Sequence, residues 1–191
     1  PTGRVCCLLA KITMLFSNKQ FQSIAASQVL TIYGSNLILP VLPIYLKLEG
    51  FSDTEIGLIM GISALGALLI RPWAGISVDV KGSKPVILVG HIFTGICLAA
   101  YLWVSSFLSF MLLRLAQGVA FAVYGTGSVT FASSVESREN TASAISMYTV
   151  FTMLGLGLAT STGPFFFEAM GFRPVILFSL AVLLIPFMIM L

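Results

Sequence analysis

One arginine lies inside a long uncharged segment, and it is the first candidate for chemistry. Arg114 is the one Lys, Arg, Asp or Glu residue between Pro85 and Val135, and Gln117 follows it by three residues. Residues three apart lie on one face of a helix, so the guanidinium and the amide are expected side by side. An arginine at the centre of a membrane helix costs about 2.5 to 3.5 kcal/mol and is rarely found there without a partner or a watery cavity. We therefore expect both side chains to face a cavity; the alternative is an arginine that snorkels to the outer surface.

A second set of polar side chains lies in the first apolar segment. Gln28, Thr31 and Ser35 recur at helical spacing, and Asn36 borders this row. Hydrogen-bonding groups in hydrocarbon usually face the bundle or a cavity. They either contact a solute or tie helices together, with each bond contributing about 0.6 kcal/mol on average. His91 could titrate near neutral pH, but a single histidine near a helix start is more often packed inside or placed at the interface.

The composition excludes several classes of protein. Hydrophobic residues make up 58% of the 191 residues and charged residues 9%, whereas a soluble domain carries about 25% charge. The chain is too apolar to be disordered, and its scattered net charge of +3 gives no reason to expect a nucleic acid partner. Cys6, Cys7 and Cys97 have neither metal-ligand spacing nor an even number for disulfides. We expect no metal and no cofactor.

The acidic residues argue against an intramembrane enzyme. All seven are expected in loops or at helix ends: Glu49, Asp53, Glu55, Asp79, Glu136, Glu139 and Glu168. No carboxylate is therefore expected in mid-membrane. The sequence also offers no His/Asp/Glu cluster, Ser–His pair or paired intramembrane carboxylates, which catalysis would require.

Charged residues divide the chain into apolar segments that are each long enough to cross a bilayer, for which about 20 residues are needed. The uncharged stretch around Arg114 is too long for one helix and should break near Trp103, Ser105 and Ser106. We predict an all-α membrane protein with six spans, at about 21–46, 55–78, 85–103, 106–131, 141–167 and 173–191. No segment resembles a cleavable signal peptide.

The distribution of basic residues predicts the orientation of the chain. With a cytoplasmic N-terminus, six basic residues fall inside and two outside; those inside are Arg4, Lys11, Lys19, Lys81, Lys84 and Arg138. The positive-inside rule therefore favours an N-terminus in the cytoplasm. All loops are short, so the function should reside within the bundle. Because the chain begins with Pro1 and stops at Leu191 inside an apolar run, we expect it to be part of a longer protein.

The turn between the second and third spans has a distinctive composition. Gly75 would allow close helix approach, Asp79 lies at the end of a helix, Gly82 permits a tight turn, and Lys84 begins the next helix. This pattern resembles the signature loop between helices two and three of the major facilitator superfamily. That family usually has a base directly after the acid, whereas this chain has a valine there. Lys81 and Lys84 are the candidate partners of Asp79.

Two further segments resemble motifs of the same superfamily. Arg114-Leu115-Ala116-Gln117-Gly118 in the fourth span is similar to its Arg-x-x-Gln-Gly motif. In the fifth span, Gly155, Ala159 and Gly163 recur every four residues and Pro164 follows. This row, which resembles part of the family's antiporter motif, should allow a second helix to approach closely. Gly57 and Gly61 suggest another close contact.

The resemblance implies the first half of a twelve-helix carrier, built as a single domain of two three-helix inverted repeats. Helices one and four line the solute path in that family, which makes Gln28, Asn36, Arg114 and Gln117 the candidate path residues. One half cannot enclose a path. A C-terminal half or a second six-helix unit is therefore an expected partner, together with the solute and the lipid bilayer.

We accordingly expect secondary active transport of a small solute by alternating access across the plasma (inner) membrane. The partial antiporter motif and the likeness to bacterial drug exporters favour efflux of a drug-like or metal-chelating compound, with protons as a candidate coupling ion. An importer or facilitator of the same superfamily is the nearest alternative. A non-transporting six-helix scaffold and an inert truncated product are the others.

Overall fold

The computed structural model describes residues 19–134 and 141–190, and all the elements in these ranges are helices. They are α2 (Lys19–Asn36), α3 (Ile38–Leu48), α4 (Asp53–Lys81), α5 (Ser83–Ala100), α6 (Phe107–Ser134), α7 (Thr141–Met170) and α8 (Phe172–Met190). Six segments of this part of the chain are long and apolar enough to cross a membrane, the first of them formed by α2 and α3 together. The prediction of six membrane helices is confirmed.

The first span is interrupted near its middle, where we expected one continuous helix. Leu37 separates α2 from α3, although its amide still donates to the carbonyl of Tyr33 at 3.0 Å. Pro40 has no N–H to give the carbonyl of Asn36, four residues earlier, and its ring crowds that turn. The interruption therefore follows from the proline that the sequence places at this point.

Local signals set the ends of α4. Ser52 caps its N-terminus in a capping box, in which the Ser52 hydroxyl accepts from the amide of Glu55 and the Glu55 carboxylate accepts from the amide of Ser52. At the other end Gly82 adopts φ +83°, a backbone conformation that glycine tolerates and most residues do not. This glycine reverses the chain between α4 and α5, where the sequence predicts a tight turn.

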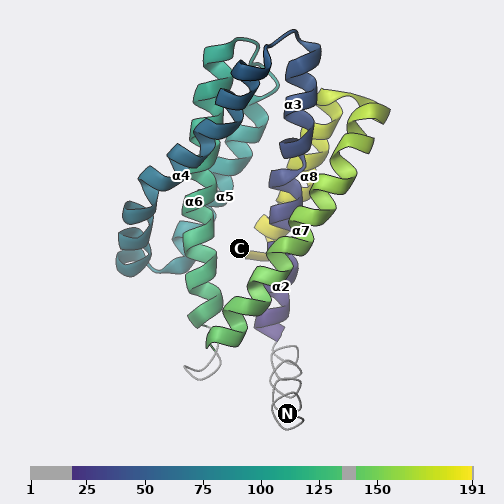
Figure 1. Ribbon diagram of the computed structural model, residues 1–191. Coiled ribbons are helices and arrows are strands. Elements are labelled where there is room, and N and C mark those ends of the chain that lie inside the picture. Colours follow the sequence, from purple (N-terminus) through teal and green to yellow (C-terminus); the bar gives the residue numbers. More distant parts are fainter. Residues whose placement is uncertain (1–18, 135–140, 191) are drawn as a thin grey trace, which may run out of the picture.

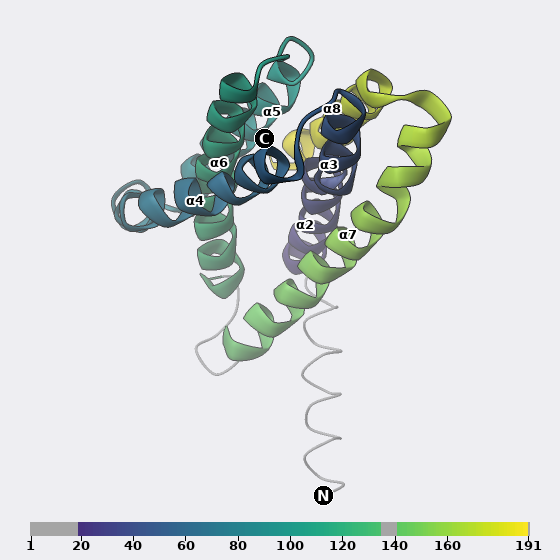
Figure 2. The same ribbon diagram turned by 45° about the horizontal axis from the view of Figure 1, so that its top comes forward.

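The helices pack in an exchanged arrangement, by which we mean that the first three membrane spans find their main contacts among the last three. α4 packs on α6, and α7 packs on α2 and α3; likewise α5 packs on α6, and α8 packs on α2. Figure 1 shows α4, α5 and α6 on one side and α2, α3, α7 and α8 on the other, and Figure 2 shows the same grouping from a second angle. Each contact between the first three spans and the last three thus has a counterpart, as two inverted three-helix repeats require.

The apolar core is centred on α3 and on the parts of the other helices that lie at the same end of the bundle. The aromatic residues in and around it include Tyr45, whose ring is stacked on Phe172 at 3.8 Å between centroids, and Phe110, which meets Tyr45 edge-on. By contrast, α4 is the least buried of the spans. Its lower end leans away from the other helices in Figures 1 and 2.

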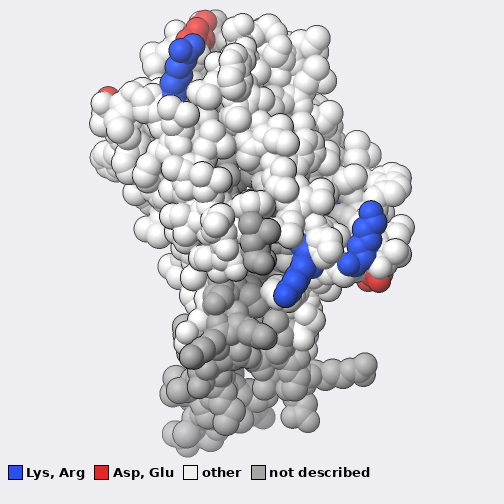
Figure 3. Space-filling model, turned by 180° about the vertical axis from the view of Figure 1, so that it is seen from behind, with Lys and Arg blue, Asp and Glu red and all other residues white. Residues whose placement is uncertain are grey.

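The outer surface is that of a protein in lipid. Large apolar side chains are exposed along α4, among them Leu68, Leu69, Trp73, Ile76 and Val80. On the face drawn in Figure 3, charged side chains gather toward two ends and a broad uncharged surface separates them. In water such a surface would be costly; in a bilayer it is the expected one.

Candidate functional site

Arg114 is buried inside the bundle. Its side chain lies on α6 with 4% of its surface exposed, and its Nη1 donates to Oε1 of Gln117 at 3.0 Å. The spacing of three residues on one helix produces this contact, as expected. The structure therefore contradicts the alternative in which the arginine snorkels to the surface.

A tyrosine completes this cluster, which we call the Arg114 cluster and define as Arg114, Gln117 and Tyr101. Tyr101 follows the last residue of α5, and its hydroxyl donates to the same Gln117 Oε1 at 2.8 Å. Burial raises the pKa of the Tyr101 phenol well above its usual value, so the hydroxyl remains a donor. The amide oxygen thus accepts two hydrogen bonds, one for each of its lone pairs.

The positive charge of Arg114 is not balanced by a carboxylate in the described part of the chain. The ion pair found there joins Lys47 and Asp53 at 2.6 Å on the surface. The Arg114 Nε is buried without a hydrogen-bond partner among the described residues. A guanidinium offers five N–H donors in a planar fork, so this one is chemically suited to hold an anionic or hydrogen-bond-accepting group.

Gln28 lies in a different cluster, although it was expected beside Arg114 on the same path. It is 2% exposed. Its Oε1 accepts from the Tyr124 hydroxyl at 2.7 Å, and its Nε2 donates to Thr152 Oγ1 at 2.9 Å. The amide therefore joins α2 to α6 and α7, which is the helix-tying role that the sequence left open.

Asn36 is half-buried and is bonded within its own helix. Its Nδ2 donates to the carbonyl of Ile32 at 2.9 Å and to the Ser35 hydroxyl at 3.0 Å. The structure thus brings Arg114 and Gln117 together but does not bring Gln28 or Asn36 into contact with them.

The turn between α4 and α5 differs from expectation in two ways. Asp79 has no ion pair with a described residue, and Lys84 instead places its Nζ over the ring of Phe131 on α6, 5.7 Å from the centroid. A Cβ built on Gly75 would meet no atom within 4 Å. The expected close approach at Gly75 is therefore wrong for the described residues, because this part of α4 is buried through Ala74 and Val78 and not through Gly75.

The row of small residues on α7 packs against the first span. A Cβ on Gly155 would lie 2.8 Å from the carbonyl oxygen of Val29, and one on Gly163 would lie 2.8 Å from that of Leu37. Ala159 between them is fully buried, and Pro164 continues the helix. The predicted close approach is thus present, with α2 as the partner of Gly155 and with Leu37 and the start of α3 as the partner of Gly163.

Gly57 and Gly61 do not behave in this way, because nothing lies within 4 Å of a Cβ on either. The close contact of α4 uses Gly66 instead, which meets the Leu115 carbonyl, and is matched on α6 by Gly118, which meets the Ser63 carbonyl. Neither glycine was predicted from the sequence to be a helix contact. Gly118 stands inside the Arg-x-x-Gln-Gly segment, and that was the available signal.

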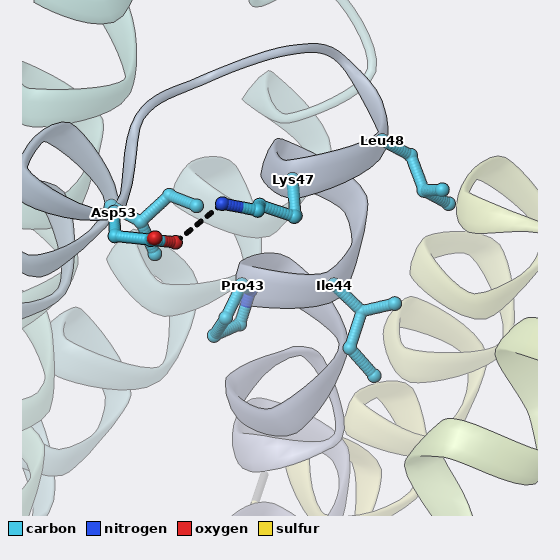
Figure 4. Close-up of a pocket in the computed structure, with 6 residues that line it drawn as sticks. Pro43, Ile44, Lys47, Leu48 and Asp53 are labelled. Carbon is cyan, nitrogen blue, oxygen red and sulfur yellow. Dashed lines mark hydrogen bonds and ion pairs between the residues drawn. The ribbon is translucent and has the colours of Figure 1, made fainter.

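A groove beside the turn between α3 and α4 lies apart from these residues. It is lined by Pro43, Ile44, Lys47, Leu48, Asp53 and Ile56. Figure 4 shows the Lys47 and Asp53 side chains pointing toward one another at its edge, with Pro43 and Ile44 below. None of the path residues predicted from the sequence lines it.

Comparison with known proteins places these features in a family. Residues 24–191 match the family model of the Major Facilitator Superfamily. Over 135 residues the chain is 27% identical to an uncharacterised MFS-type transporter of Methanocaldococcus jannaschii, covering 71% of this chain and 34% of that protein. Over 151 residues it is 26% identical to the quinolone resistance protein NorA of Staphylococcus aureus, covering 79% of this chain and 39% of NorA.

The chain thus spans well under half the length of these two relatives. The family match nevertheless includes all six membrane helices and the segments that carry Arg114, Gly82 and Gly163. With its exchanged three-helix packing and its buried Arg-x-x-Gln-Gly segment, the chain belongs to the Major Facilitator Superfamily.

Proposed function

We propose that this protein is a secondary active transporter that exports a small drug-like or metal-chelating solute by alternating access. Membership of a transporter superfamily supports transport, and the likeness to a quinolone resistance protein favours export. The observation that carries the proposal is the Arg114 cluster, a buried guanidinium with an unused donor and no carboxylate partner among the described residues.

In this proposal Arg114 binds the solute and its neighbours position it. Gln117 holds one edge of the guanidinium, and Tyr101, at the end of the preceding helix α5, holds Gln117 in place. The free Nε and the remaining donors can then hold an acceptor group of the solute. Asn36, half-buried on α2, is a second proposed contact, whereas Gln28 holds α2 against α6 and α7.

The proposal requires a second six-helix unit, because alternating access occurs between two such units around a site near the bilayer midplane. A C-terminal half or a second polypeptide would fill this role. The turn formed by Asp79, Gly82 and Lys84 is proposed to gate the movement, since Asp79 is exposed and has no ion pair with a described residue. We place the N-terminus in the cytoplasm and the protein in the plasma membrane, following the basic residues.

Export of a fluorescent quinolone from energised cells that express this chain together with its second six-helix unit tests the proposal. Arg114→Ala should abolish export while the amount of protein in the membrane stays the same. Arg173→Ala, which removes an exposed arginine at the start of α8, is the matched control and should export like the parent.

Each other outcome has a defined meaning. Unchanged export by Arg114→Ala would remove Arg114 from the mechanism. Accumulation of the quinolone in place of export would favour an importer. If the parent is present in the membrane and moves no solute in either direction, the scaffold or truncated-product alternatives are favoured.

A further inference from the structure

His91 lies in the middle of a membrane helix. Ser83 is the first residue of α5 and His91 the ninth of 18, which places it about 12 to 14 Å from either end of the helix. We expected it near the start of a span at 85–103; both ends of α5 lie earlier in the sequence, at Ser83 and Ala100, which corrects that expectation. A hydrocarbon core is about 30 Å thick, so the imidazole lies near mid-membrane.

The imidazole makes a hydrogen bond on one side only. It is 4% exposed, and its Nε2 lies 2.8 Å from the backbone carbonyl oxygen of Leu183 on α8. A carbonyl can only accept, so Nε2 carries the proton and Nδ1 has a free lone pair. Pro186 lacks the N–H that would bond to the carbonyl of Val182, the residue before Leu183, so the helix is disturbed at this turn.

Nδ1 of His91 is one of several buried polar atoms without a partner. The others include the hydroxyls of Ser27 and Thr31 on α2 and of Ser179 on α8. These two helices pack on one another and on α5. Buried polar atoms are normally paired, and internal water usually pairs those that protein groups leave open. The helices that pack on α5 therefore offer buried polar atoms of the kind that internal water pairs.

Among the described residues, no hydrogen bond, ion pair or ring contact joins His91 to a carboxylate. From α6 the titratable neighbour is Tyr124, whose ring centroid is 5.8 Å away, and α8 contributes the ring of Phe187 at 6.0 Å. The described titratable side chain of α2, Tyr33, is bonded to Thr162 of α7 instead. The charged residues beside the turn between α4 and α5 are Asp79 and Lys81 in the last turn of α4 and Lys84 in the first turn of α5.

Protonation of His91 would change one edge of the ring and leave the other intact. The bond from Nε2–H to Leu183 persists in both states, while Nδ1 changes from an acceptor into a donor. Histidine is the side chain whose unperturbed charge change lies closest to neutral pH, which makes His91 the group of this region best suited to bind a proton. The partly stacked ring of Phe187 and the neighbouring ring of Tyr124 offer π-faces to the cation.

We propose that His91 is a proton-binding residue of this six-helix unit, with Nδ1 as the acceptor and bound water beside the hydroxyls of α2 and α8 as the medium that delivers the proton. The use of this proton to drive transport rests on the proposed function. The proposal that His91 binds a proton does not rest on the proposed function.

Nuclear magnetic resonance of ¹⁵N-labelled histidine in the untagged full chain tests proton binding directly. The signal of His91 is identified by its loss in His91→Gln. We expect the Nε2–H tautomer at high pH and protonation of Nδ1 as the pH is lowered, while the protein remains folded. If the ring stays neutral at every pH at which the protein is folded, the proposal is overturned.

Transport in proteoliposomes tests the coupling. His91→Gln keeps an amide donor for the Leu183 carbonyl but cannot bind a proton, so it should still exchange labelled quinolone for unlabelled quinolone while a pH gradient no longer drives accumulation. Thr94→Val is the control, because Thr94 is buried one turn further along α5 and bonds to its own helix; it should accumulate like the parent.

The two proposals fail in different ways. Gradient-driven accumulation by His91→Gln, or a parent whose transport ignores the pH gradient, would overturn the coupling role and leave transport standing. A parent that moves no quinolone would overturn the proposed function, and the resonance titration would still decide whether His91 binds a proton.

Discussion

At the level of single residues, one amide oxygen holds the Arg114 cluster together. Gln117 Oε1 accepts from both Arg114 and Tyr101. Gln117→Leu would leave two buried donors without this acceptor, and an unsatisfied buried group costs about 1–3 kcal/mol. We predict a clearly lower thermal unfolding midpoint in detergent together with loss of quinolone export.

Thr126→Val is the control for this prediction. Thr126 lies on the same helix, and its hydroxyl bonds only to the Ala122 carbonyl one turn earlier. Its removal should change the midpoint little. Equal midpoints for the two variants would mean that Gln117 does not stabilise the cluster.

The sequence predicted the local part of this site and missed the rest. Arg114 and Gln117 could be paired because the spacing along one helix determines their contact. Tyr101 and Tyr124 could not be assigned, since their hydroxyls reach residues on other helices, Gln117 on α6 and Gln28 on α2. The direction of such a side chain depends on how each helix is rotated against its neighbour, which periodicity alone does not determine.

At the level of helices, the contact between α4 and α6 depends on glycine at two positions. A Cβ on Gly118 would lie 2.0 Å from the backbone oxygen of Ser63, and one on Gly66 would lie 2.3 Å from that of Leu115. Neither oxygen can move without its helix. Gly118→Ala should therefore separate the helices and lower the free energy of unfolding by roughly 1–3 kcal/mol, the usual cost of overpacking.

Gly125→Ala is the matched control, because this position is on the same helix and has no atom within 4 Å of a built Cβ. Alanine should be neutral there or stabilise the helix by up to about 1 kcal/mol. Denaturation of both variants in the same detergent measures the difference. Similar free energies of unfolding would show that α6 can shift to accommodate a methyl group at Gly118.

Glycine spacing alone does not predict which helix faces contact a neighbour. The rows Gly155–Gly163 and Gly57–Gly61 look alike in sequence, but only the first meets another helix in the described chain. The spacing of the glycines shows that one face of a helix carries small residues. Which helix lies against that face, and whether any does, is decided by the packing of the whole bundle.

At the level of the whole molecule, hydropathy was sufficient to predict the number of spans and the break between the third and fourth, which lies between Ala100 and Phe107. This works because a bilayer requires long apolar helices whatever their partners. The exchanged packing of the two repeats cannot be predicted from periodicity. The inverted repeats were expected only from the family resemblance.

The orientation of the chain in the membrane can be measured directly with two variants, each carrying one introduced cysteine in a protein that lacks Cys6, Cys7 and Cys97. Leu48 and Val80 lie at opposite ends of the bundle and are 74% and 77% exposed. In intact cells an impermeant maleimide should label Leu48→Cys, while Val80→Cys should react only after the cells are opened. The reverse pattern would place the N-terminus outside and contradict the positive-inside rule here.

The exchanged packing has a consequence for how the protein is made. The first span finds its main neighbours in α7 and α8, and α4 finds its own in α6. The ribosome makes these partners later than the helices that need them. The buried side of the first span, with the amide of Gln28, must therefore remain covered by lipid, the insertion machinery or a chaperone until the sixth span emerges. The nascent chain cannot mature repeat by repeat, and a ribosome that stalls after α6 leaves a product that membrane quality control can recognise.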